Sequence, residues 1–158
     1  LQRPGLSFRM AHQQSQPQLQ PRLLALDPGE ARIGVAVSDD LGLYAHPRPA
    51  IRTRSVAEAV RAVVRLVQQE VVAEVIVGLP LTLAGARGHQ AEATRPLVEA
   101  LRAALAVPVR EIDERLSSAQ AAAASPGLGG KRDGSLDSAS AAVVLQGVLD
   151  RRRREAAR

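Results

Sequence analysis

Three strand-like segments precede the first helical pattern of this chain, and their order is the feature that most constrains its fold. They cover residues 23–27, 32–38 and 43–51, and the turns between them are too short to hold a crossover helix. Consecutive strands joined by short turns pair antiparallel, so we expect a three-stranded meander. Pro47 and Pro49 remove two backbone donors from the third segment, which predicts an edge position for it.

The stretch LDPGEARIGVAVSD carries the first turn of this meander. The proline and glycine after Asp27 favour a tight turn, since proline presets φ and glycine supplies a positive φ. Asp27 therefore lies where an apolar strand meets solvent, and taken alone it is better explained as the start of the turn than as a functional residue. Gly34 interrupts the second strand, which indicates either a β-bulge or a close approach by backbone or substrate.

Helical and strand patterns alternate after the meander. Ser55 and Glu58 have capping-box spacing. They open a helix whose expected apolar stripe consists of Val56, Ala59, Val60, Val63 and Val67. The remaining pattern predicts two strands, at 74–79 and 107–113, and three helices, at 90–105 (kinked or started late at Pro96), from Ser117 onward, and at 136–150.

Helices cross over between the later strands, so those strands should run parallel to the first. The sequence therefore predicts an α/β fold, a five-stranded mixed sheet in the order β-β-β-α-β-α-β-α with helices packed on it. The domain is expected over 22–150. Residues 1–21 are rich in Gln, Pro and Ser and predict a disordered tail without the apolar centre of a signal peptide. Residues 151–158 are interpreted as a basic, frayed tail, although arginines also suit a helix C-terminus.

Composition narrows the classes of function. Aromatic residues make up 1% of the chain, which argues against modules that stack bases on aromatic side chains. The chain has no cysteine, so thiolate zinc sites and disulfides are excluded. No apolar run reaches the length of a membrane span. The formal net charge of +5 suits a phosphate-rich partner, and it equally suits solubility alone.

Four acids fall at the ends of predicted elements. Asp27 ends the first strand, Asp113 and Glu114 end the fifth, and Asp137 opens the last helix. Sites in such sheets gather beyond the carboxyl ends of the parallel strands, so we expect these acids at one rim. The small residues that follow Asp137, at 140 and 141, would let its helix approach the sheet closely.

Carboxylates gathered at one rim repel one another unless a cation neutralises them. Oxygen ligands without His or Cys select hard ions, so the pattern predicts Mg²⁺ or Mn²⁺. Paired ions of this kind activate water and stabilise the leaving oxygen in phosphodiester hydrolysis. Each acid also has an ordinary explanation. Asp137 can complement a helix dipole, Asp113 can pair with Arg115, and Glu114 can be solvated.

Basic side chains in the predicted loops are candidates for gripping a phosphate backbone. The loop bracketed by Gly85 and Gly88 carries one of them, and a later loop carries two more just before Asp137. Solvated loops are the alternative explanation. The candidate nucleic-acid contacts are Arg32, Arg87, Arg115, Lys131 and Arg132.

Four stretches of the chain, in this order, resemble the YqgF/RuvX family. They are LDPGEARIGVAVSDDLGLYAHP, VIVGLPLTLAGARGHQAEATR, EIDERLSS and DSASAAVVLQGVLD. The resemblance covers about residues 23–150. It implies an RNase H-like fold, a bacterial cytoplasmic location, and metal-dependent hydrolysis of nucleic acid in maturation of the 16S rRNA 5′ end. The family's acids carry over onto Asp27, the triplet Asp113-Glu114-Arg115, and Asp137.

The chain departs from related resolvases at the end of its fourth predicted strand. Those proteins place an acid there, whereas this chain reads Gly-Leu-Pro at 78–80. The third metal ligand would then come from the fifth strand, where the longer Glu114 is favoured over Asp113. A second departure is Thr82-Leu83, where the family more usually has a polar pair. This difference concerns a substrate contact and not the metal site.

Three alternatives stay open on the sequence alone. The first is a nuclease acting on DNA junctions or single strands. The second is a non-catalytic RNA-binding module of the same fold. The third, a phosphoryl-transfer protein of the actin and sugar-kinase kind, would need two such domains. The expected partners are nucleic acid, with pre-16S rRNA favoured, and the small ribosomal subunit. The prolines on the edge strand argue for a monomer or a weak homodimer.

Overall fold

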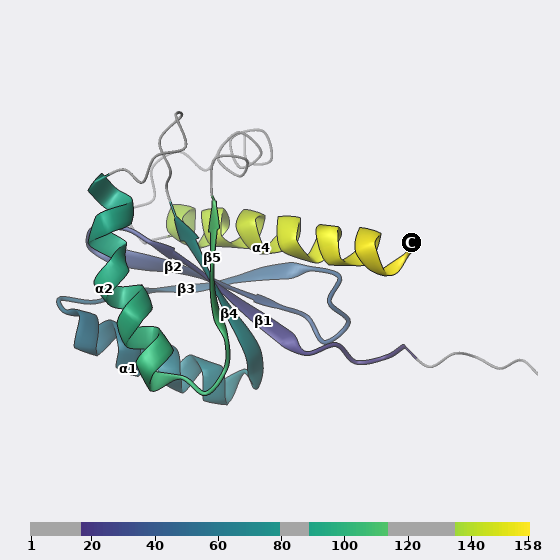
Figure 1. Cartoon of the computed structure of the whole chain (residues 1–158), viewed down its shortest axis with the longest axis horizontal. Coiled ribbons are helices and arrows are strands. Elements are labelled where there is room, and N and C mark those ends of the chain that lie inside the picture. The colour runs from purple at the N-terminus through teal and green to yellow at the C-terminus, as the bar shows by residue number, and fades with distance from the viewer. Residues whose placement is uncertain (1–16, 80–88, 114–134) are drawn as a thin grey trace, which may run out of the picture.

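The computed structural model describes residues 17–79, 89–113 and 135–158 (Figure 1). Five strands and three helices lie within these ranges. In chain order they are β1 (Arg22–Pro28), β2 (Arg32–Ser38), β3 (Ala45–Arg52), α1 (Val56–Gln69), β4 (Val72–Leu79), α2 (His89–Ala104), β5 (Val109–Asp113) and α4 (Ser135–Ala156). The expected helix from Ser117 lies outside the described residues.

The five strands form one mixed sheet in the order β3-β2-β1-β4-β5. β1, β2 and β3 pair antiparallel, and β4 and β5 run parallel to β1. This arrangement confirms the predicted meander, the parallel later strands and the edge position of the strand with two prolines. It also brings the carboxyl ends of β1, β4 and β5 to one rim of the sheet.

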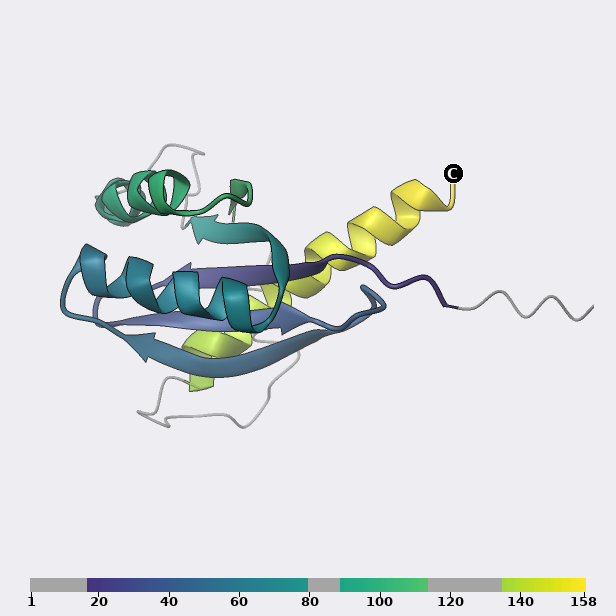
Figure 2. The same ribbon diagram turned by 90° about the horizontal axis from the view of Figure 1, so that it is seen from below.

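Helices cover both faces of the sheet. Figure 2 shows α1 in front of the strands and α4 behind them. The side chains of β1 pack alternately into the two cores on either face of the sheet, because successive side chains of a strand point to opposite faces. Leu24 and Leu26 belong to the core beneath α1 and α2. Leu23 and Ala25 belong to the core beneath α4.

Small side chains let α4 lie close to the sheet. Ala25, Ala36 and Ala141 are fully buried where the helix crosses β1 and β2. Further along, the Gln146 side chain accepts a hydrogen bond from the Ala45 N–H at 3.0 Å and donates one to the Leu43 carbonyl at 2.9 Å. These contacts fix the helix against the start of the edge strand β3.

The capping of α1 is confirmed, with two differences. The Ser55 hydroxyl accepts the Glu58 N–H at 3.2 Å, as predicted. The Glu58 carboxylate accepts the N–H of Arg54 and not that of Ser55, so the box closes one residue earlier. Val56 is exposed, so the apolar stripe of α1 begins one turn later than expected, at Ala59.

A late start of α2 at Pro96 is wrong, because the helix begins at His89 and contains the proline. Pro96 is exposed and cannot donate to the carbonyl of Glu92, which is also exposed. Water can therefore satisfy that carbonyl, and the helix continues.

The last helix is longer than its apolar pattern indicated. α4 continues past Asp150 to Ala156, so the arginines expected in a frayed tail are helical. Arg152 forms an ion pair with Glu74 of β4 at 2.6 Å, and Arg153 forms one with Asp150. A tertiary ion pair and a local one thus support two turns that have little apolar surface. Across the described ranges, no helix is both long and apolar enough to cross a membrane.

Candidate active site

Asp27 lies at the carboxyl end of β1, half-buried. Asp27 lies two residues after Ala25 and four after Leu23, and alternate residues of a strand face the same side. Its side chain therefore belongs to the α4 face of the sheet, as theirs do. Its partner across the antiparallel ladder is Gly34 of β2. On the parallel side Leu26 pairs with Val77, so the residue level with Asp27 on β4 is Gly78.

Glycines thus flank Asp27 on both neighbouring strands. No side chain occupies the α4 face beside this carboxylate at either position. In β-sheets such glycines mark places where a ligand or another backbone approaches closely. The hairpin of β1 and β2 therefore presents Asp27 at the rim between two positions that carry no side chain.

The turn that follows Asp27 is tight, but its expected mechanism is wrong. The Gly29 N–H donates to the Arg32 carbonyl at 2.8 Å. Gly29 does not adopt a positive φ, unlike Gly42. A Cβ at Gly29 would lie 3.0 Å from the Arg32 carbonyl oxygen, so the glycine is required by close packing in the turn.

Gly34 lies at a β-bulge, which confirms one of its two explanations. Between Ile33 and Val35 the pairing of β2 with β3 shifts, and β3 contributes one more residue than β2. At this shift the Val35 N–H donates to the Oγ of Ser138 at 3.2 Å. Ser138 is buried, so this bond is shielded from water.

This hydrogen bond places the first turn of α4 beside the Asp27 hairpin. Ser138 follows Asp137 in the chain, and Val35 follows Gly34, the cross-strand partner of Asp27. The two segments that carry Asp27 and Asp137 therefore converge at the rim. Ala141 is fully buried, which agrees with the predicted close approach of this helix to the sheet.

Asp113 ends β5 and pairs with Leu79 of β4. It lies two strand spacings from β1, roughly 10 Å. Ile112 packs into the core beneath α4, so alternation assigns Asp113 and Glu111 to the α2 face. Consistently, Glu111 forms an ion pair with Arg102 of α2 at 3.6 Å. Asp113 thus shares the rim with Asp27 but belongs to the other face of the sheet.

Arg32 begins β2 on the same face as Gly34 and lies directly opposite Arg52 of β3. Like charges directly opposite each other destabilise a sheet. Neither arginine has an ion-pair partner within the described ranges. The pair therefore offers two cations to an anionic ligand at the rim. The sequence did not indicate Arg52, because the register of β3 decides its position.

The described residues contain no group of three His, Cys, Asp or Glu side chains close enough to hold a metal ion. Of the predicted ligands, Asp27 is described with its side chain, and Asp137 is described only as part of the first turn of α4. Glu114 lies outside the described ranges, as do Arg87, Arg115, Lys131 and Arg132. The chemistry that is present, carboxylate oxygen beside two glycines, fits a hard divalent cation.

Ionisable groups with shifted pKa values gather at the other end of the sheet. The guanidinium of Arg48, and then that of Arg22, lowers the pKa of Glu70. A hydrogen bond from Arg22 lowers the pKa of Asp40. These residues join the start of β1 to β3, to the C-terminus of α1 and to the β2–β3 loop. Their role is to hold elements together, away from the Asp27 rim.

Comparisons with known proteins agree with this architecture. A family model described as "RuvX: Holliday junction resolvase" matches residues 21–151. A "Putative pre-16S rRNA nuclease" of Chloroflexus aurantiacus is 43% identical over 134 residues, which are 83% of this chain and 88% of that protein. Proteins of the same name are 40% identical in Anaeromyxobacter sp. (strain K) and 36% identical in Halothermothrix orenii. The Anaeromyxobacter match covers 83% of this chain and 98% of that protein. The Halothermothrix match covers 82% of this chain and 94% of that protein.

Solved structures extend the agreement to the fold. T. thermophilus RuvC in complex with a Holliday junction substrate superposes with a TM-score of 0.58 at 16% identity, over 85% of this chain and 96% of that chain. A second Thermus thermophilus RuvC structure gives a TM-score of 0.55 at 14% identity, over 84% and 96% of the two chains. The fold is therefore RNase H-like, as expected. With the family model spanning nearly the whole described domain, this chain belongs to the RuvX family.

Proposed function

We propose that this chain is a hydrolase, a metal-dependent nuclease that cleaves phosphodiesters during maturation of the 16S rRNA 5′ end. The observation that carries the proposal is the setting of Asp27. Its carboxylate lies between two glycines, and the first turn of α4 is tied to the neighbouring strand by the Ser138–Val35 hydrogen bond. Membership of a family with relatives named for pre-16S rRNA supports the substrate class.

Asp27, Asp137 and Glu114 would hold Mg²⁺ or Mn²⁺. Glu114 is proposed over Asp113 as the third ligand, because Asp113 belongs to the α2 face of the sheet. A cation bound there would supply Lewis-acid stabilisation of a phosphoryl oxygen and a lowered pKa for an attacking water.

The remaining groups would bind and orient the substrate. Arg32 and Arg52 would contact phosphates that flank the scissile one, since Arg32 begins β2 and Arg52 ends β3 at the Asp27 rim. Gly34 and Gly78 would let the nucleic-acid backbone approach the carboxylate. None of these contacts reads a base, so we expect substrate shape and end structure to set specificity.

DNA is the second candidate substrate, because the matching family model is described as a Holliday junction resolvase. We propose a cytoplasmic enzyme that meets its substrate on the small ribosomal subunit, as a monomer or a weak homodimer. A non-catalytic RNA-binding protein of the same fold would bind these substrates without cutting them.

The test is cleavage of a labelled RNA spanning the 16S 5′ leader, beside a single-stranded DNA and a four-way junction. Each is incubated with Mg²⁺, with Mn²⁺ and with chelator. We expect Asp27→Asn to lower cleavage by about 100-fold or more while binding and the unfolding temperature stay near wild type, because a metal ligand is lost. Asp40→Asn is the matched control at the opposite end of the sheet, and it should cut normally. Undiminished cleavage by Asp27→Asn would refute the assignment.

A further inference from the structure

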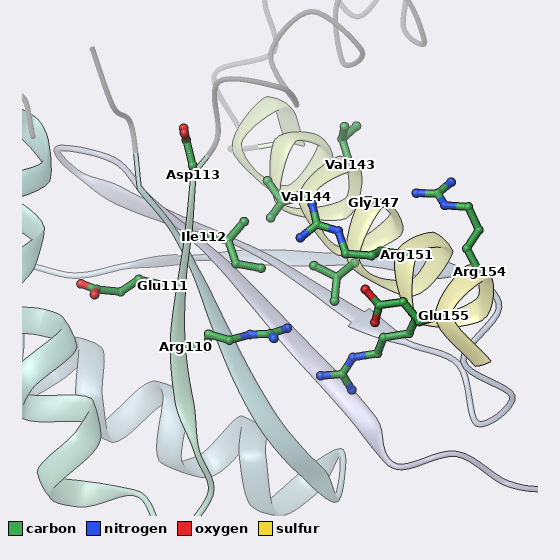
Figure 3. Close-up of a pocket in the computed structure, with 12 residues that line it drawn as sticks. Arg110, Glu111, Ile112, Asp113, Val143, Val144, Gly147, Arg151, Arg154 and Glu155 are labelled. Atoms are coloured by element: carbon green, nitrogen blue, oxygen red, sulfur yellow. The ribbon is translucent and has the colours of Figure 1, made fainter. Parts of the chain in front are cut away.

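A groove separates β5 from α4 on the α4 face of the sheet (Figure 3). It arises because, among the described elements, α4 packs most extensively on β2, β3 and β1 and contacts β5 little. Its volume is about 580 Å³. Its floor is apolar, formed by Ile112, Val143, Val144 and Val148.

Arginines line both walls of the groove. Figure 3 shows Arg110 pointing from β5 toward α4 and Arg151 pointing from α4 toward β5. Arg110 and Arg152 both pair with Glu74, at 3.2 and 2.6 Å. Arg151 and Arg154 make no ion pair within the described ranges. The groove therefore carries two guanidinium groups that no ion pair of the described residues neutralises, and one of them, Arg154, also helps to lower the pKa of Asp150.

One stripe of α4 faces this space. Val143, Gly147, Arg151 and Arg154 follow one another at spacings of four, four and three residues, so they share one side of the helix. A Cβ at Gly147 would meet nothing within 4 Å. The carboxylate of Glu155 also lines the groove and opposes an anionic ligand there.

We propose that this groove binds the phosphodiester backbone of the nucleic-acid substrate on one side of the scissile phosphate. The inference rests on the proposed function, because one end of the groove opens at Asp113, on the rim that carries Asp27. A strand leaving that rim along α4 would meet Arg151 and then Arg154. Continuity with the rim favours nucleic acid over an acidic peptide, which would not need it. Because no aromatic residue lines the groove, it would bind nucleic acid of any sequence.

The first test is binding of labelled leader RNA by full-length chains that carry Asp27→Asn to prevent cleavage. Arg151→Glu/Arg154→Glu is compared with Arg61→Glu/Arg65→Glu. Each pair consists of exposed arginines about one turn apart, and the two double substitutions change the charge equally. The control pair, Arg61 and Arg65, lies on α1, which covers the other face of the sheet. We expect the groove variant to bind roughly tenfold more weakly than the α1 variant. Its salt slope should fall by about 1.4 if two phosphate contacts are lost.

Two further variants separate shape from charge. Gly147→Trp would fill the groove without changing charge, and it should weaken binding, whereas Ala57→Trp on exposed α1 should not. Glu155→Gln should tighten binding, since it removes a carboxylate from the lining.

The outcomes distinguish the two proposals. If the groove variants bind RNA and junction DNA no more weakly than the α1 controls, the groove inference is overturned, whatever Asp27→Asn does to cleavage. If they bind weakly while the wild-type chain cuts nothing under any metal, the groove stands as a nucleic-acid site and the nuclease proposal fails. Binding of an acidic peptide that is lost in Gly147→Trp while RNA binding is retained would also overturn the inference.

Discussion

At the scale of single residues, the setting of Asp27 depends on what its neighbours lack. Both strands beside it carry glycine at the same level, so no side chain from either position lies beside the carboxylate on the α4 face. The position of Asp27 at the end of a strand could be predicted from its sequence. The two glycines beside it could not be matched to it, because strand register depends on pairing across the sheet.

The space beside Asp27 can be tested by filling it. Gly78→Val should lower cleavage by about tenfold or more, because a branched side chain on the α4 face would stand where substrate or metal approaches. Gly78 is buried, so the larger side chain should also lower the unfolding temperature, and cleavage is therefore measured well below that temperature. The measurement is the cleavage rate over a series of Mn²⁺ concentrations. A rate equal to wild type would show that the glycine serves the packing of β4 alone.

At the scale of elements, α4 was predicted well at its start and poorly at its end. The small residues after Asp137 indicated a close approach to the sheet, and buried Ala141 confirms it. The two turns after Asp150 have no apolar period, so the pattern gave no reason to extend the helix. A tertiary ion pair between Arg152 and Glu74 supports them, and such a pair is invisible until the fold brings its members together.

Ser138 is the residue whose loss should loosen this element. Ser138→Ala would leave the buried Val35 N–H without its side-chain acceptor, which costs about 1–3 kcal/mol of unfolding free energy. Ser140→Ala, two residues further on and half-buried, should lower the free energy of unfolding by about 0.5 kcal/mol at most. Chemical denaturation of both variants measures the difference. Equal stabilities would mean that water replaces the Ser138 hydroxyl.

At the scale of the whole molecule, the two ends of the sheet have different tasks. The Asp27 rim gathers candidate ligands and cations for a substrate. The opposite end holds a network in which Arg22 contacts Asp40 and Glu70, and Arg48 contacts Glu70. This network joins the first strand to a loop, to an edge strand and to a helix end, so it should contribute to stability and not to cleavage.

Lowering the pH should remove part of this contribution to the free energy of unfolding. The pKa of Glu70 is lowered in the folded chain, mainly by Arg48, so its stabilisation is present above the ordinary pKa and is lost as pH falls through the lowered one. Glu70→Gln should therefore be less stable than wild type at pH 7, with the difference shrinking as the solution becomes acidic. Urea unfolding from pH 7 to pH 3 provides the measurement. A difference independent of pH would assign the effect to packing.

The Ser138–Val35 hydrogen bond has a consequence for the time at which the protein becomes active. It joins the second strand to the last helix, residues separated by most of the domain. During translation the hairpin bearing Asp27 emerges before the helix bearing Asp137, because the two bonded residues are 103 positions apart. A nascent chain from which that helix has not yet emerged therefore lacks half of its proposed site. Newly made molecules would gain the capacity to cut only after the helix has emerged and docked on the hairpin.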